Sequence, residues 1–178
     1  MIQVTDDDVV LTRALDQLAE LLDDVPPDSL GGWTPCEAWT VQDLVDHIVA
    51  APAKFARMVR GEPVDWSAPT PSAGDDPAGA FRAHAAELLR AWHDVDGPAP
   101  QPGADWQCAE FAVHTWDLAA ALHLSTRDLD REVAARGLAF MRANLTDDRR
   151  GPAFGPQQSV PEHADVYQRI AAFAGRSV

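Results

Sequence analysis

The sequence predicts an all-α fold, most simply a four-helix bundle with extra short helices, and three observations lead to this expectation. Apolar residues recur at steps of three and four over several long segments, as in helices that bury one face. Proline and glycine separate these segments, and no alternating β-rich run or internal repeat interrupts them. The 178 residues are enough for one sizeable core, so we expect a single domain over residues 1–178.

The first two helices have clear start and stop signals. Thr5 and the three aspartates after it can cap a helix and place negative charge at its positive end, and Pro26 ends that helix. Residues 33–39 are predicted to form an ordered loop. Thr40 then caps a second helix that continues to about Gly61.

The later helices have similar start and stop residues. Pro77 suits the first position of a third helix, which we expect to end at Gly97. Ser125 or Thr126 is the expected cap of a fifth helix. The predicted ranges of the last three helices are 105–123, 127–148 and 165–174.

The net charge of the chain limits the classes of partner that we expect. Lys and Arg number 14 and Asp and Glu number 28, which gives a formal net charge of −14. Nucleic acid and anionic membranes attract basic surfaces, so we expect neither as a partner. The N-terminus lacks the basic and apolar regions of a signal peptide, and no apolar run approaches the ~18 residues of a membrane span. A cytoplasmic protein is therefore expected, and its two cysteines, Cys36 and Cys108, are expected to be reduced thiols.

Glu110 and His114 are the residues of greatest chemical interest. They lie four apart in the predicted fourth helix, so both point into the bundle from one face. A buried carboxylate needs a compensating partner, and His47 faces inward from the second helix. Two histidines and one glutamate with an open position form the ligand set of catalytic zinc sites. Spacing alone equally allows a simple hydrogen bond between His114 and Glu110, with His47 as a core histidine.

Two segments that contain these residues resemble a known family. The stretch TPCEAWTVQDLVDH, residues 34–47, resembles the TPCxxWxVxDLxxH signature of actinobacterial DinB-like proteins, a metal-binding superfamily that includes mycothiol-dependent maleylpyruvate isomerase. The stretch EFAVHTWDLA, residues 110–119, is similar to that family's ExxxHxWDLA signature. The FGP, VPE and AFAGR segments of the tail are similar to the end of its short members.

The resemblance implies a function as well as a fold. In that family the matching His, Glu and His bind a divalent metal, which implies His47, Glu110 and His114 as ligands here, with zinc first and nickel or another ion behind it. The open position implies that the metal activates the thiol of mycothiol, a low-molecular-weight cofactor. The activated thiol would either be transferred to a small electrophilic substrate or isomerise that substrate. The isomerase has an additional C-terminal domain that this sequence lacks, so maleylpyruvate itself is not the expected substrate. Two alternatives remain: a non-catalytic metal- or small-molecule-binding protein of the same fold, and a structural interaction module.

Residues around the three predicted ligands have simpler expected roles. Asp117 is a candidate to orient His114 from outside the ligand set, whereas Asp43 serves equally well as a helix-start residue. Cys36 is expected to hold its loop in place rather than to bind metal. Surface or helix-end positions are expected for His84, His93, His123 and His163, core or pocket-wall positions for Trp33, Trp39 and Trp116, and salt bridges for Arg169 and Arg176.

Overall fold

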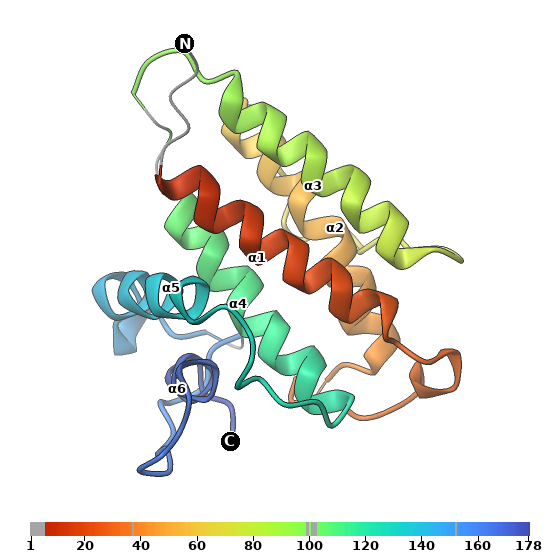
Figure 1. Cartoon of the computed structure of the whole chain (residues 1–178). Coiled ribbons are helices and arrows are strands. Elements are labelled where there is room, and N and C mark those ends of the chain that lie inside the picture. The colour runs from red at the N-terminus through yellow and green to blue at the C-terminus, as the bar shows by residue number, and fades with distance from the viewer. Residues whose placement is uncertain (1–5, 37, 99, 101–102, 152) are drawn as a thin grey trace.

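The computed structural model describes residues 6–36, 38–98, 100, 103–151 and 153–178. Within these ranges it has six α-helices and two short 3-10 helices and no named strand, which confirms the all-α prediction (Figure 1). The elements, in chain order, are α1 (Asp6–Asp23), η1 (Pro27–Ser29), α2 (Val41–Val59), α3 (Pro77–His93), α4 (Ala104–Ala121), α5 (Arg131–Asn144), η2 (Asp147–Arg149) and α6 (Val166–Phe173).

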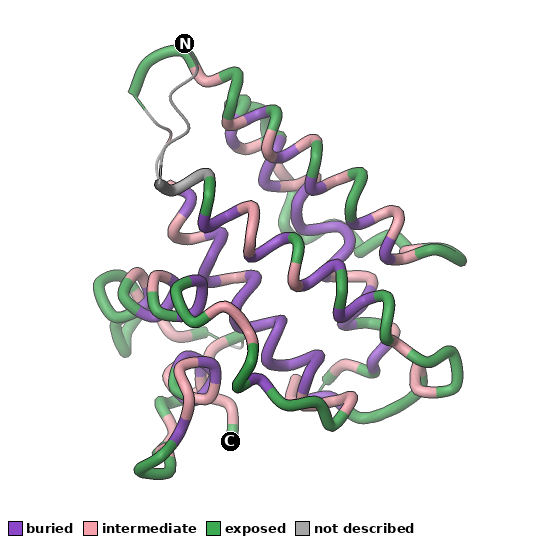
Figure 2. Tube along the Cα trace, in the orientation of Figure 1, coloured by how far each residue is buried: buried purple, intermediate pink, exposed green. Residues whose placement is uncertain are grey.

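The first four helices form the bundle. Helix α1 packs against α3 and α4, and α2 packs against the same two neighbours. Their inner faces are buried along most of their length (Figure 2). Three aromatic rings fill the centre, since Phe111 of α4 meets Phe55 of α2 and Phe81 of α3 edge to face, with ring centroids 5.7 and 6.3 Å apart. This packing fixes α2 beside α4, which is the pair that carries the predicted ligands.

Helix α4 is the central element of the molecule. Thirteen of its 18 residues are buried. The bundle covers one side of it, and α5 and α6 cover the other (Figure 1). A helix that is covered on both sides is apolar nearly all round. The polar residues that α4 does bury, His114 and Asp117 among them, therefore need partners within the protein.

Helix α5 approaches α4 closely at a glycine. A Cβ atom on Gly137 would lie 2.8 Å from Cα of Ala109, closer than real side chains allow. Only a residue without a side chain permits this contact. The distance between α4 and α5 is therefore set at this one position.

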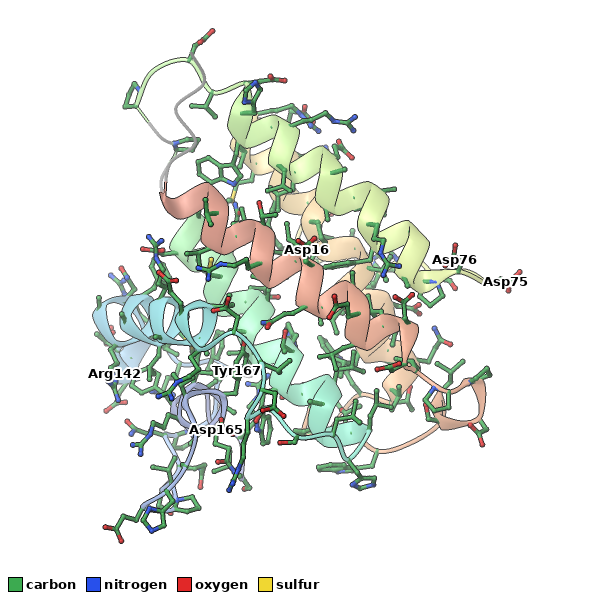
Figure 3. All side chains as sticks on the ribbon, viewed as in Figure 1. Asp16, Asp75, Asp76, Arg142, Asp165 and Tyr167 are labelled. Atoms are coloured by element: carbon green, nitrogen blue, oxygen red, sulfur yellow. The ribbon has the colours of Figure 1, made fainter. Side chains whose placement is uncertain are left out.

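Helix α6 is tied to the start of α5. Tyr167 is buried, and its hydroxyl donates a hydrogen bond to the carbonyl oxygen of Asp130 over 3.0 Å. The hydroxyl of Thr126 donates to the carboxylate of Asp165, the N-terminal cap of α6, over 2.9 Å. Asp165 and Tyr167 are labelled in Figure 3. These contacts hold the C-terminal segment against the bundle.

The predicted boundaries of the third and fifth helices were wrong. Helix α5 begins at Arg131 instead of 127 and ends at Asn144, because Thr126 is used by Asp165 and the carboxylate of Asp130 caps the helix instead. Helix α3 ends at His93, four residues before Gly97. The predicted cap Thr5 lies outside the described residues. Helix α2 passes through Pro52 and ends at Val59, two residues before the predicted Gly61.

Within the described residues, none of the helices combines the length and the apolar composition that a membrane span needs. Cys36 is half-buried and Cys108 is buried, and the two are not joined in a disulfide.

Candidate metal centre

The start of α2 sets the position of His47. Thr40 and Asp43 form a capping box, in which the Thr40 hydroxyl accepts from the backbone N–H of Asp43 and the Asp43 carboxylate accepts from the backbone N–H of Thr40. Asp43 is therefore a helix-start residue, as its alternative interpretation predicted. His47 follows one turn later, on the face of α2 that meets α4.

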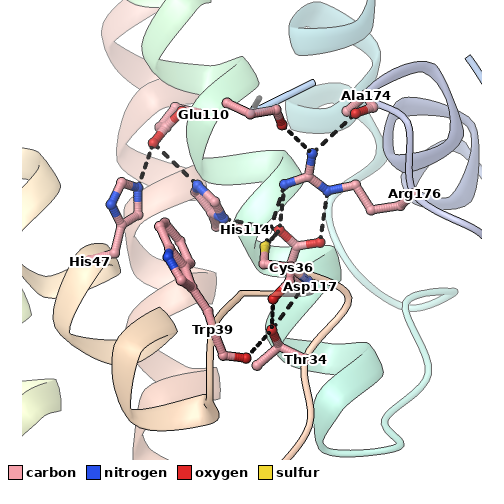
Figure 4. Close-up of polar contacts among 10 residues, drawn as sticks. Thr34, Cys36, Trp39, His47, Glu110, His114, Asp117, Ala174 and Arg176 are labelled. Carbon is pink, nitrogen blue, oxygen red and sulfur yellow. Dashed lines mark hydrogen bonds and ion pairs between the residues drawn. The ribbon is translucent and has the colours of Figure 1, made fainter. Parts of the chain in front are cut away.

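His47, Glu110 and His114 converge, as predicted (Figure 4). Nε2 of His47 lies 2.9 Å from Oε1 of Glu110, and Nε2 of His114 lies 3.2 Å from the same oxygen. The centroids of the two imidazole rings are 4.7 Å apart. One nitrogen of each histidine thus faces one carboxylate oxygen, the arrangement of donor atoms that a small cation requires.

The three side chains are more exposed than the buried carboxylate and inward-facing histidines that the sequence suggested. Those of His47 and Glu110 are 26% and 22% exposed, and that of His114 is 10% exposed. Burial by itself would raise the pKa of Glu110, but His114 and His47 outweigh it and hold that pKa well below its usual value. Two imidazoles therefore already compensate the carboxylate, so it does not depend on a metal for a partner.

Asp117 contacts the other nitrogen of His114. Its Oδ2 lies 3.0 Å from Nδ1, so Nε2 of His114 is left facing Glu110. Burial alone would lower the pKa of His114, but the carboxylates of Glu110 and Asp117 raise it well above its usual value. A carboxylate on the far nitrogen fixes the orientation of a ligating imidazole, which is the role expected for Asp117.

Arg176 supplies the counter-charge for Asp117. The Asp117 side chain is completely buried, and Arg176 donates to both of its oxygens, from Nε to Oδ1 over 3.1 Å and from Nη2 to Oδ2 over 3.0 Å. Burial would raise the pKa of Asp117, but His114 and Arg176 together lower it. Asp117 is thus a charged group held by a two-point contact.

A glycine turn brings Arg176 to this position. Gly175 has φ of +95°, and a Cβ atom there would lie 2.6 Å from the backbone nitrogen of Gly155. The chain can therefore turn out of α6 and pack against the preceding segment only with glycine at 175. The salt bridge predicted for Arg176 is confirmed, whereas Arg169 donates to the backbone carbonyls of Ala164 and Glu162.

Cys36 belongs to the same group of contacts. Its thiol lies 3.2 Å from Oδ2 of Asp117 and 3.6 Å from Nη2 of Arg176. Cys36, His114 and Asp117 also have ligand atoms within 4.8 Å of one another. The Asp117 carboxylate, however, is already occupied by Arg176 and by Nδ1 of His114, so the Nε2 side of His114 offers the better site.

The loop before α2 closes over the two histidines. The ring centroid of Trp39 lies 4.8 Å from that of His47 and 6.1 Å from that of His114. The hydroxyl of buried Thr34 holds the loop, since it lies 2.9 Å from the carbonyl oxygen of Trp39 and accepts from the backbone N–H of Cys36. Trp39 is thus a wall of the site and Trp116 is buried, as predicted, but Trp33 is 67% exposed.

The comparisons with known proteins agree with this geometry. Residues 11–119 match the family described as the mycothiol maleylpyruvate isomerase N-terminal domain. The chain belongs to this family. The mycothiol maleylpyruvate isomerase N-terminal domain family is a DinB-like metal-binding family, and its match covers both segments that carry His47, Glu110 and His114.

Two relatives match nearly the whole chain. They are "Uncharacterized protein MT0763" of Mycobacterium tuberculosis strain CDC 1551 / Oshkosh and "Uncharacterized protein Rv0738" of strain ATCC 25618 / H37Rv. Each is 34% identical over an alignment of 182 residues, gaps included, that covers 93% of this chain and 95% of the relative. No solved structure matches the chain. The family therefore supports a mycothiol-related metal-binding domain and leaves the reaction to be argued from the site.

The contacts among Asp117, Arg176 and Cys36 were not found by sequence reasoning. The matched family segment ends at residue 119, well before Arg176. The only available signal was the AFAGR segment of the tail, which resembles the end of short family members. That segment gave no partner for its arginine.

Proposed function

We propose that this protein binds a divalent metal ion, with zinc as the first candidate, through His47, Glu110 and His114. We further propose that, in the cytoplasm, it either transfers the thiol of mycothiol to a small electrophilic substrate or uses that thiol to isomerise such a substrate. One observation carries the proposal: two imidazole nitrogens face one carboxylate oxygen from two helices, in a site whose side chains are partly exposed to solvent.

The donor set fits a zinc ion. Zinc bonds of about 2.0 to 2.1 Å place tetrahedral ligands about 3.3 Å apart. The ligand atoms here lie 2.9 and 3.2 Å apart in the two contacts with Glu110, and all three are within 4.8 Å of one another. Side-chain adjustments of a few tenths of an ångström to about 1 Å would therefore suffice. Nickel or another ion that accepts nitrogen and oxygen ligands fits the same donor set.

The residues of the chain have separate roles in this proposal. His47, Glu110 and His114 would hold the ion and leave its remaining position to solvent and ligand. Asp117 holds a hydrogen bond on Nδ1 of His114, and Arg176 keeps Asp117 charged. A bound divalent cation with an open position would lower the pKa of a ligating thiol, so that it acts as a nucleophile at neutral pH.

Metal analysis of the purified protein, followed by calorimetry with mycothiol, tests the proposal. We expect close to one divalent ion per chain, and mycothiol binding that disappears after chelation. His47→Ala should lose both, whereas His93→Ala, which removes an exposed imidazole at the end of α3, should keep both.

Turnover is tested separately with a panel of small electrophiles such as epoxides and unsaturated acids. Loss of free mycothiol reports transfer, and conversion of cis to trans unsaturated acids reports isomerisation, which returns the thiol. Faster loss of thiol with metal-loaded protein than with metal-free protein or buffer supports catalysis. Equal rates of thiol loss and of isomerisation in all three, together with retained metal and mycothiol binding, would indicate the non-catalytic alternative of the same fold.

A further inference from the structure

A pocket of about 150 Å³ lies beside the candidate metal centre, between α4, α5 and the segment that follows η2. The side chains that line it are apolar, Trp106, Phe140, Leu145 and Phe154 among them, except for Glu110 and Asn144. An apolar cavity of about this size accommodates a benzene-sized molecule. The pocket is therefore large enough for one ring or a short alkyl chain.

Glu110 joins the pocket to the metal centre. It lines the pocket and also contacts both His47 and His114 through Oε1. On α4, Trp106 and Val113 line the pocket while His114 and Asp117 belong to the centre, so the two sites share Glu110 at their boundary. A molecule that fills the pocket would thus lie against a proposed metal ligand.

The charges around the pocket disfavour an anion. None of the described residues that line it is cationic, and exposed Arg149, which donates to the backbone carbonyl of Asn144, does not line it. Glu110 carries a negative charge that a bound metal ion would offset. Arg176, the cation beside the centre, directs all three nitrogens to protein atoms, namely both Asp117 oxygens, the Cys36 sulfur and the carbonyl oxygens of Ala153 and Ala174. A carboxylate held among the apolar side chains of this pocket, and not on the proposed metal ion itself, would lose hydration without contacting a cationic side chain.

We propose that this pocket binds the apolar part of a neutral electrophilic substrate, no larger than one ring or a short alkyl chain, and that it discriminates against substrates that carry a carboxylate there. The inference rests on the proposed function, because it names the substrate class of the same site. The pocket would accept small apolar electrophiles, such as aryl or alkyl epoxides, and disfavour unsaturated diacids.

The test compares two non-reactive probes on the metal-loaded full chain by ligand-observed NMR and calorimetry. Benzyl alcohol is neutral, and benzenesulfonate is an anion of similar ring size and a weak metal ligand. We expect benzyl alcohol to bind at least tenfold more tightly. Equal or tighter binding of benzenesulfonate, or no binding of benzyl alcohol, would overturn the proposal.

Two pairs of variants locate the effect. Asn144→Arg places a cation at the pocket, whereas Ala143→Arg places one on the neighbouring exposed residue that does not line it. We expect only Asn144→Arg to strengthen benzenesulfonate binding, by about tenfold. Leu145→Trp should block benzyl alcohol while the metal content stays unchanged, and unaltered binding in this variant would place the probe elsewhere and refute the assignment.

Because the probes do not react, these results are independent of turnover. A protein that binds benzyl alcohol in the pocket but neither consumes mycothiol nor isomerises an unsaturated acid would refute the catalytic part of the proposed function and leave the pocket assignment standing. Thiol consumption with unsaturated diacids at rates that match those with neutral epoxides would refute the pocket assignment alone.

Discussion

The three proposed ligands and the residues that support them differ in how completely their polar atoms are satisfied. His47 and Glu110 are about one quarter exposed, and their contacts converge on a single carboxylate oxygen. Asp117 is fully buried and Arg176 nearly so, and their charges are paired with each other (Figure 4). The side chains of the first group can contact a ligand that enters from solvent, whereas the charges of the second group are already paired within the protein. This contrast separates side chains that can meet a ligand from those that hold them in place.

The largest effect should come from removing a proposed ligand. His114→Ala leaves two ligands, so we expect divalent metal affinity to fall on the order of 10⁴-fold, which corresponds to about 5.5 kcal/mol. A competition titration against a chromophoric chelator measures the loss. Metal affinity within threefold of the native value would show that His114 is not a ligand.

Removing the buried counter-charge should mainly affect folding. Arg176→Met leaves Asp117 buried without its cation, so the free energy of unfolding should fall by about 3 to 5 kcal/mol in urea denaturation. Arg142→Met is the matched control, because Arg142 is exposed on α5 and its replacement should change stability by less than about 0.5 kcal/mol (Figure 3). Similar stability losses in the two variants would contradict a special role for Arg176.

A smaller effect is expected from neutralising Asp117. Asp117→Asn should weaken metal binding by about 10- to 100-fold, the usual result of changing the partner of a ligating histidine. Asp43→Asn offers a matched control, since Asp43 lies four residues before His47 but caps α2. It should lower the melting temperature and change metal affinity less than twofold. If the two variants weakened metal binding equally, orientation through Nδ1 of His114 would be refuted.

The smallest effect concerns protons. The pKa of His114 in the metal-free protein is raised well above 6.5, so the imidazole is protonated at pH 7 and must lose its proton to bind metal. Calorimetry in buffers of different ionisation enthalpy should therefore show release of about one proton, and affinity should rise about tenfold per pH unit up to that pKa. Asp117→Asn should reduce the release at pH 7. Metal uptake without proton release in the native protein would contradict the raised pKa.

The raised pKa of His114 also makes the stability of the metal-free protein depend on pH. A group whose folded pKa is raised contributes its full stabilisation below its unfolded value of 6.5 and loses it as pH rises through the folded pKa. The depressed pKa of Asp117 acts in the opposite direction, because its contribution is present above 3.8 and is lost as pH falls further.

Helical periodicity was sufficient to predict the bundle and the shared face of Glu110 and His114, because both depend on contacts within one helix. It placed His47 on the inward face of α2, and the family resemblance linked it to the other two. The start of α5 was mispredicted for a tertiary reason, since Thr126 contacts Asp165, 39 residues away. Local capping preferences cannot register such competition.

The support behind His114 was hidden for the same reason. Asp117 is 81 residues from Cys36 and 59 from Arg176, and no periodicity relates positions so far apart. The sequence suggested a salt bridge for Arg176 without naming its partner. The pocket was also beyond prediction, because its walls come from α4, α5 and the segment after η2, whose relative placement depends on packing.

The close contact at Gly137 has a consequence for how this family of sites can change its substrates. Gly137 does not line the pocket, yet the missing side chain lets α5 settle against Ala109, a residue that does. A single methyl group at this position would act as a spacer that pushes the two helices apart. The capacity of the pocket is thus adjustable from outside it, and a change of substrate size need not alter any residue that touches the substrate.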